Sequence, residues 1–119
     1  MSELLINTKP LDENICLVVL NGVLDNETAK TLSETFHDLF ARRIWKFVVD
    51  LSDLNYMGSP GIGLFISFID SLEEHKGTIV FIYPQPNVKE VFKIFKLSNF
   101  YSITRNLDSA IKELRDLIH

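Results

Sequence analysis

The octapeptide YMGSPGIG, residues 56–63, has the residue types and spacing that come closest to a chemical site. Its serine, Ser59, could act as a nucleophile, help to hold a phosphate, cap a helix or accept a phosphoryl group. The outer glycines of the motif have the spacing of a phosphate-binding P-loop. A P-loop continues with Lys and then Ser or Thr, which bind the terminal phosphates and magnesium, whereas Leu64 and Phe65 follow here. The sequence therefore argues against a P-loop.

A serine hydrolase is disfavoured for two reasons. Its nucleophile elbow needs glycine two residues before and two residues after the serine, and only Gly61 meets this requirement, because Met57 holds the earlier position. The base would be a histidine, and His37, His75 and His119 each have the context of a surface residue. No His, Cys or carboxylate residues have the spacing of metal ligands. We therefore expect no enzyme activity, no cofactor and no metal.

The pair Ser59-Pro60 is typical of a helix start, with serine as the N-cap and proline as the first helical residue. On this interpretation Ser59→Ala would cost about 1 kcal/mol of stability. The predicted helix runs from Pro60 to His75, and Leu64 and Phe68 extend its apolar arc to about 200°, against the roughly 100° that a surface helix needs. Either another helix covers this edge or a partner protein does. The core stripe of this helix is predicted to be Ile62, Phe65, Ile66, Ile69 and Leu72.

The whole chain has 119 residues, 46% of them apolar, with five Gly and four Pro, which fits one domain over residues 1–119. Its formal charge of −4 disfavours nucleic-acid binding. Lys89, Lys93 and Lys96 fall on neighbouring turns of one segment. This stripe is either an ordinary solvated face or a docking patch.

Cys16 is the single cysteine and lies in an apolar run, which predicts a buried, inert thiol. The N-terminal segment lacks the features of a signal peptide, and no apolar stretch is long enough to insert in a membrane. We therefore expect a cytoplasmic protein.

Periodicity predicts strands that alternate with helices. Apolar runs at 4–8 and 15–20 indicate a hairpin or adjacent strands. A helix follows Asn26, its predicted N-cap, and is indicated by apolar residues at helical spacing. These are Ala29, Leu32, Phe36, Leu39 and Phe40.

The second half of the chain repeats this alternation. The nearly continuous apolar run WKFVVDL, 45–51, predicts a central strand covered on both faces, and TIVFIY, 78–83, predicts another. Asn87 is the predicted N-cap of a short helix, YSIT is predicted as a brief edge strand, and Asp108 is the predicted N-cap of a last helix through Ile118. The order indicates an α/β fold with one mixed sheet of four to five strands and about four helices packed against it.

Three blocks of the sequence, in this order, resemble the STAS domain of bacterial anti-sigma factor antagonists. They are LNGVLDNETA at 20–29, VVDLSDLNYMGSPGIG at 48–63 and NVKEVFKIFKLSNFYSI at 87–103, so that the resemblance covers nearly the whole chain. It implies a small cytoplasmic binding protein of bacterial signalling and transcription regulation, and not an enzyme. The partners that it implies are an anti-sigma factor serine kinase, which inactivates the antagonist by phosphorylation, and a metal-dependent serine phosphatase, which reverses the modification.

The resemblance also implies a site. The acceptor motif of the family is roughly Asp-Ser-Ser-Gly-Leu-Gly, and its acceptor serine falls on Ser59; Gly58 replaces the usual Asp, and Pro60 replaces the usual Ser or Thr. The segment that contains Asp25 matches the family loop beside the acceptor. The alternative is a STAS subunit that is not phosphorylated, within a lipid-transport or larger signalling complex. The predicted partner surface consists of Asp25, Asn26, Gly58, Ser59, Pro60, Gly61, Leu64 and Phe68.

Overall fold

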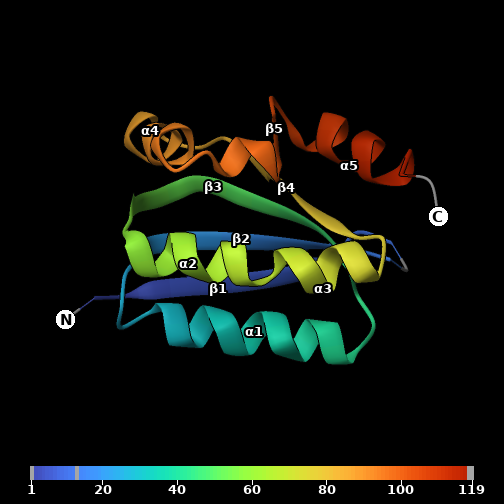
Figure 1. The fold of residues 1–119 in the computed structure, drawn as a ribbon, viewed down its shortest axis with the longest axis horizontal. Coiled ribbons are helices and arrows are strands. Elements are labelled where there is room, and N and C mark those ends of the chain that lie inside the picture. The colour runs from blue at the N-terminus through green and yellow to red at the C-terminus, as the bar shows by residue number, and fades with distance from the viewer. Residues whose placement is uncertain (1, 13, 118–119) are drawn as a thin grey trace.

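The structure, a computed structural model, describes residues 2–12 and 14–117 of the chain. Its elements in chain order are β1 (Leu4–Pro10), β2 (Ile15–Leu24), α1 (Ala29–Ala41), β3 (Lys46–Met57), α2 (Ser59–Ser67), α3 (Ile69–Glu74), β4 (Thr78–Ile82), α4 (Pro86–Ile94), the 3₁₀ helix η1 (Leu97–Asn99), β5 (Ser102–Thr104) and α5 (Leu107–Arg115). The strands form one sheet in the order β1-β2-β3-β4-β5 (Figure 1). β1 and β2 pair antiparallel, and the other pairs are parallel. The predicted mixed α/β sheet is confirmed.

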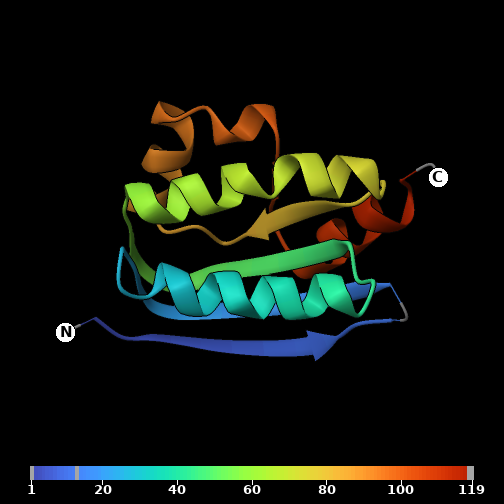
Figure 2. The same cartoon turned by 60° about the horizontal axis from the view of Figure 1, so that its bottom comes forward.

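Side chains of the inner strands alternate between two covered faces, as the continuous apolar run at 45–51 predicts. On β3, Phe47 and Val49 join the larger core, which α1, α2, α3, α4 and η1 cover, whereas Val48 joins a smaller core under α5. Figure 2 shows α1 and the α2–α3 pair on one side of the strands and α5 on the other. β3 is the central strand, because it pairs with β2 on one side and β4 on the other, in the middle of the sheet order.

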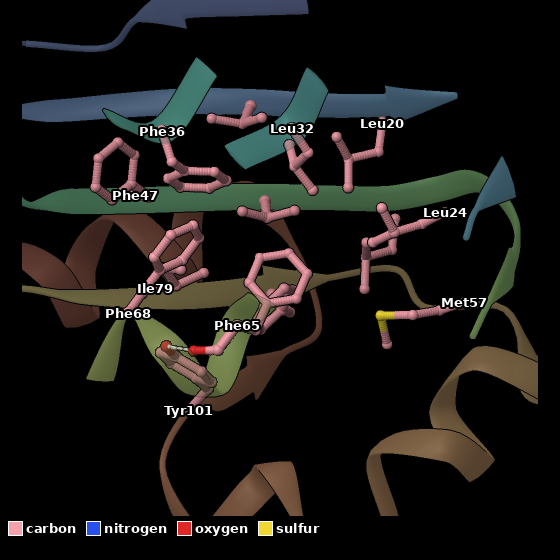
Figure 3. Packing of buried hydrophobic residues seen from close by; sticks show 14 of the residues in the cluster. Leu20, Leu24, Leu32, Phe36, Phe47, Met57, Phe65, Phe68, Ile79 and Tyr101 are labelled. Atoms are coloured by element: carbon pink, nitrogen blue, oxygen red, sulfur yellow. Dashed lines mark hydrogen bonds between the residues drawn. The ribbon is translucent and has the colours of Figure 1, made fainter. Parts of the chain in front are cut away.

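Phenylalanine rings fill the larger core. The ring of Phe36 on α1 lies 5.0 Å from that of Phe47 on β3 and 4.9 Å from that of Phe68, between ring centroids (Figure 3). Phe65 on α2 packs edge-on against Phe81 on β4 at 5.1 Å. These contacts fix α1 and α2 against the sheet, since large aromatic side chains dominate the burial energy of a small core.

The predicted helix from Pro60 to His75 is divided into α2 and α3 at Phe68. In a continuous helix the carbonyl oxygen of Phe65 accepts from the amide four residues later. Here the buried hydroxyl of Tyr101 donates to that oxygen (Figure 3). A side chain that inserts in the helical hydrogen-bond ladder is a known cause of a break.

Two predicted N-caps in the second half of the chain are wrong. Gln85, in place of Asn87, is the N-cap of α4, because Pro86 with its fixed φ takes the first helical position. Asn106, in place of Asp108, is the N-cap of α5, and its side chain accepts a hydrogen bond of 2.8 Å from the amide of Ser109. The predicted end of this helix at Ile118 lies outside the described residues.

The smaller expectations for the frame are confirmed. The hairpin of β1 and β2, helix α1 and the edge strand β5 all form. The thiol of Cys16 is buried, and burial raises its pKa, as expected of an unreactive cysteine. Within residues 2–12 and 14–117, no helix is long and apolar enough to cross a membrane.

Candidate functional site

Ser59 lies directly after the central strand, at the first position of α2. Gly58 alone separates it from β3, and Gly58 is the N-cap in extended conformation, with φ −89° and ψ 178°. The side chain of Ser59 is exposed, and Pro60 lies in the first turn. The predicted exposed position is therefore confirmed. The predicted capping role of Ser59 is wrong, because β3 continues to Met57 and moves the cap to Gly58, and α2 has no side-chain cap hydrogen bond.

β3 is longer than the predicted strand because its last part has a different environment. Its pairing with β4 ends at Asp50, while its pairing with β2 continues to Met57 with two register shifts. The buried residues in this part, Leu51, Leu54 and Met57, are three apart, since bulges interrupt the alternation of faces. The period of two that identifies a strand is thus absent from the sequence here.

After Asp50, β3 no longer pairs with β4, and side-chain amides donate hydrogen bonds to its carbonyl oxygens instead. Gln85 donates from Nε2 to the carbonyl oxygen of Ser52 at 2.9 Å, and Asn87 donates from Nδ2 to that of Asn55 at 2.7 Å. Neither residue was predicted to contribute to the site. Their contribution could not be inferred from spacing, because each bond joins residues more than 30 positions apart in the chain.

The Asp25 loop is ordered by hydrogen bonds within the loop and to Ser2. Oδ1 of Asp25 accepts from the amides of Glu27 at 2.9 Å and Thr28 at 3.1 Å, while Oγ1 of Thr28 accepts from the amide of Asp25 at 3.0 Å. This reciprocal arrangement has the geometry of a capping box. The N-cap of α1 itself is Thr28, so the prediction of Asn26 as the N-cap is wrong, and Asn26 is exposed.

The carboxylate of Asp25 has a pKa below its ordinary value. The largest cause is the hydrogen bond that it accepts at Oδ2 from the hydroxyl of Ser2, followed by the amide of Thr28. Donors that bond to the charged form favour ionisation. The loop thus carries a fixed negative charge at neutral pH.

The Asp25 loop and the Ser59 junction are joined through the residues that precede them. The amide of Gly58 donates to the carbonyl oxygen of Leu24 at 2.9 Å. Gly61 lies directly over Leu24 and Met57, since a Cβ at this position would come within 2.7 Å and 3.0 Å of their side-chain carbons. Figure 3 shows the side chains of Leu24 and Met57 close together at this end of β2 and β3. The structure thus brings the two predicted loops together.

Tyr56 is a residue of this junction that the sequence did not predict. A Cβ on Gly58 would lie 3.1 Å from both the ring and the hydroxyl oxygen of Tyr56, so the ring covers the glycine backbone. About half of the Tyr56 surface is exposed, at 51%. An aromatic side chain beside an exposed serine is a candidate contact for a partner protein.

The apolar edge predicted on the helix is only partly exposed. Phe68 is 2% exposed and packs against Phe36 and Phe40 of α1, so its predicted role as a surface anchor is wrong. Leu64 is half-buried, and Ile66, predicted in the core, is 45% exposed. Phe68, with Phe65 and Leu72, forms the core stripe in place of Ile66, because the rings of α1 pack on Phe68. α1 thus covers one edge, and Leu64 and Ile66 remain near the surface.

Within the described residues, the contacts of His37 and His75 are with residues other than Ser59. His37 bonds through Nδ1 to the carbonyl oxygen of Ser33, and His75 stacks on Trp45 with ring centroids 3.6 Å apart. His119 lies outside the described residues. Among residues 2–12 and 14–117, no cluster of His, Cys, Asp and Glu could hold a metal ion. The chemistry that the junction offers is that of an exposed hydroxyl beside an ordered carboxylate loop.

Comparison with known proteins gives consistent matches along the chain. The family model described as STAS domain matches residues 8–110. BtrV of Bordetella bronchiseptica, provisionally assigned as an anti-sigma factor antagonist, is 22% identical over 98 residues, which are 82% of this chain and 84% of BtrV.

Solved structures show the same fold. An anti-sigma factor antagonist from Mycobacterium paratuberculosis superimposes with a TM-score of 0.85 at 20% identity, over 96% of each chain. The anti-sigma factor antagonist SpoIIAA in its unphosphorylated form gives 0.82 at 19% identity, over 97% of this chain and 100% of that one. The phosphorylated form of the Bacillus cell fate determinant SpoIIAA gives 0.73 at 20% identity, over 93% of this chain and 100% of that one.

Proposed function

The chain belongs to the STAS domain family, and we propose on this basis that it is an anti-sigma factor antagonist that phosphorylation of Ser59 switches off. In this proposal the unmodified protein binds an anti-sigma factor serine kinase, and binding releases a sigma factor. The kinase phosphorylates Ser59, and a metal-dependent serine phosphatase restores the hydroxyl. The protein itself acts in the cytoplasm as a binding module and not as an enzyme.

The observation that carries the proposal is the position of Ser59. Its side chain is exposed at the start of α2, makes no capping bond, and follows the glycine that is hydrogen-bonded to the base of the Asp25 loop. A serine with no structural bond can be modified without loss of a contact. Relatives of this fold include a protein solved both with and without phosphorylation, which supports the same chemistry in this chain.

The electrostatic effect of a phosphate at Ser59 would be local. A phosphoserine adds about −1.5 to −2 charges at neutral pH. The positive end of the α2 dipole favours this charge. The amides of Gly58 and Gly61 are already bonded, to Leu24 and Gly58 oxygens, and Pro60 has none, so the helix start offers a phosphate fewer donors than an ordinary one. Few amides of the protein itself would therefore neutralise the phosphate, and its charge would act mainly on a bound partner.

The proposed partner surface consists of exposed and half-buried residues around this serine. It contains Asp25 and Asn26 of the loop, Ser59 and Pro60 of the junction, and Leu64 on α2. Tyr56 and Ile66 extend it, because both are about half exposed. Gly58 and Gly61 are buried, so they position the backbone of the junction and offer no surface to a partner. Phe68 belongs to the core.

Two measurements test the proposal. The first is capture of partners from the native cytosol on the immobilised chain, where a serine kinase of the anti-sigma type is the expected partner. The second is incubation of the chain with that kinase and ATP, followed by intact mass. One added phosphate in the wild type and none in Ser59→Ala is the expected result. Binding without phosphate addition would refute the switch while leaving the antagonist role in place.

A second candidate function rests on the two residues beside the serine. Gly58 brings no carboxylate, and Pro60 brings neither a hydroxyl nor an amide donor, so the junction has less polar chemistry than the usual acceptor motif. The alternative is a STAS subunit of a lipid-transport or larger signalling complex that is never phosphorylated. Capture of a stable complex without a serine kinase would favour it.

A further inference from the structure

A groove between α4, η1 and β5 has no part in the proposed switch. Its volume is about 400 Å³, and Lys89, Phe92, Lys93, Ser98 and Ile103 are among the residues that line it. A neighbouring hollow of about 310 Å³ shares Lys89 and Ile103 with it. The two hollows therefore adjoin at these two residues.

The groove combines an apolar floor with a basic rim. The half-buried Ile103 lies at the floor together with Phe92, of which only 1% is exposed. Lys89, Lys93 and, in the neighbouring hollow, Arg105 are exposed cations, and Glu90 is the one carboxylate among the described residues that line the two hollows. The whole chain has a formal charge of −4, so this rim has the opposite sign to the molecule.

β5, whose Ile103 lines the groove, is also an edge strand of the sheet. It is the last strand in the sheet order and pairs with β4 on one side only, within the part of the chain that the structure describes (Figure 1). An edge strand presents amide and carbonyl groups to an added strand. Pairing of an extended peptide with such an edge is a common mode of recognition.

We infer that this groove binds an extended acidic segment of a partner protein. An apolar side chain of the segment occupies the hollow over Phe92 and Ile103, and its carboxylates pair with Lys89, Lys93 and Arg105. A second copy of the chain is a poor occupant, because it would bring two basic rims together. A bilayer is also a poor occupant, because a flat surface does not fill a groove.

The test uses a fluorescein-labelled peptide of alternating Glu and Val, and a twin with Gln in place of Glu. Fluorescence anisotropy measures affinity, and amide resonances in two-dimensional NMR locate the site. We expect the Glu peptide to bind, the Gln twin to bind at least about tenfold more weakly, and the shifts to centre on Phe92 and Ile103. In Lys89→Glu/Lys93→Glu, affinity should fall about tenfold or more, since two attractions become repulsions.

Matched variants separate the groove from general charge effects. Lys9→Glu/Lys76→Glu changes the net charge equally at exposed positions elsewhere and should bind as the wild type does. Ser98→Tyr should block the groove, whereas Asn99→Tyr, at the next exposed position, should not.

Several results would overturn the inference. They are equal affinity for the Gln twin, shifts that centre away from β5, unchanged binding by Ser98→Tyr, and dimerisation through this edge in sedimentation. Binding to vesicles of anionic lipid that Ser98→Tyr leaves intact would assign the lysines to a membrane surface instead. Ser59→Asp should retain peptide binding, so that failure of the switch and failure of this inference are distinguishable.

Discussion

Helix α2 contributes both to the aromatic core and to the Ser59 junction, and these two regions are stabilised in different ways. Between α1, α2 and the sheet, rings such as those of Phe36, Phe65 and Phe68 are buried and contact one another. At the start of α2, the chain is held by main-chain and amide hydrogen bonds, and the side chain of Ser59 contributes none to the helix cap. The buried rings thus stabilise the fold, whereas the start of α2 presents the exposed hydroxyl of Ser59.

Because the two regions are stabilised differently, the site can change without loss of the fold. Burial of a large apolar side chain is worth about 1.5–3 kcal/mol, whereas substitutions at exposed positions usually change stability by about 0.5 kcal/mol or less. The core therefore sets the position of α2, and the residues at its start can be selected for binding. Five variants test whether the two regions are as separate as this comparison requires.

The largest effect is expected from Phe68→Ala. Removal of a buried phenylalanine ring costs about 3–5 kcal/mol of the free energy of unfolding, through lost burial and the cavity left behind. Urea denaturation measures it. Ile66→Ala, an exposed neighbour on α2, is the control and should cost about 0.5 kcal/mol or less. Equal losses for both variants would contradict the exchange of these residues between core and surface.

Ser59→Asp should produce the largest effect on binding with little effect on folding. A misplaced charge at an interface can cost several kcal/mol, and about 2.7 kcal/mol already weakens affinity a hundredfold. Titration calorimetry with the captured kinase measures this loss, while the melting temperature should stay near that of the wild type. Ser71→Asp adds the same charge at an exposed position of α3 and is the matched control. Unchanged affinity of Ser59→Asp would argue against an electrostatic switch.

Tyr101→Phe should weaken the boundary between α2 and α3. Burial raises the pKa of the Tyr101 hydroxyl, so that it stays protonated and continues to donate to the Phe65 oxygen. Loss of this hydrogen bond leaves the Phe65 oxygen with only the 3.3 Å bond from the amide of Phe68, at a cost of about 0.5–1.5 kcal/mol in the free energy of unfolding. Tyr83→Phe, at an exposed position, provides the comparison and should be nearly neutral. Faster amide exchange confined to α3 in the first variant would locate the effect.

Asp25→Asn should change how the stability of the protein depends on pH. The pKa of Asp25 is lowered in the folded state, so the carboxylate stabilises the fold above its unfolded pKa of about 3.9. That contribution is lost as pH falls through the lower folded value. The difference in urea midpoint between wild type and Asp25→Asn should therefore be largest near neutral pH and decrease below about pH 4. A constant difference across this range would show that the charge of Asp25 does not support the loop.

The sequence predicted the frame of this molecule better than its junctions. Apolar periodicity identified the run at 45–51 as the central strand, because burial on both faces leaves a continuous pattern. The bonds from Gln85 and Asn87 to the end of β3 left no such pattern, since they join distant segments through polar groups. The predicted cap at Ser59 failed because a cap depends on where the preceding strand ends, and β3 continues through its bulges to Met57. The predicted cap at Asn87 failed for a different reason, because Pro86 takes the first helical position.

The smallest effect is expected from Ser59→Ala, and it separates the two interpretations of this serine. If Ser59 were the cap of α2, alanine would cost about 1 kcal/mol. Since Gly58 is the N-cap and no side chain caps this helix, we expect a change of about 0.5 kcal/mol or less in urea denaturation. Asn106→Ala provides the scale, because the side chain of Asn106 does cap α5 and its removal should cost about 1 kcal/mol. Equal losses for the two variants would show that the Ser59 hydroxyl caps α2 in solution, and a cap would then suffice to explain the residue. A neutral Ser59→Ala that binds the kinase and accepts no phosphate would leave modification as the role of the hydroxyl.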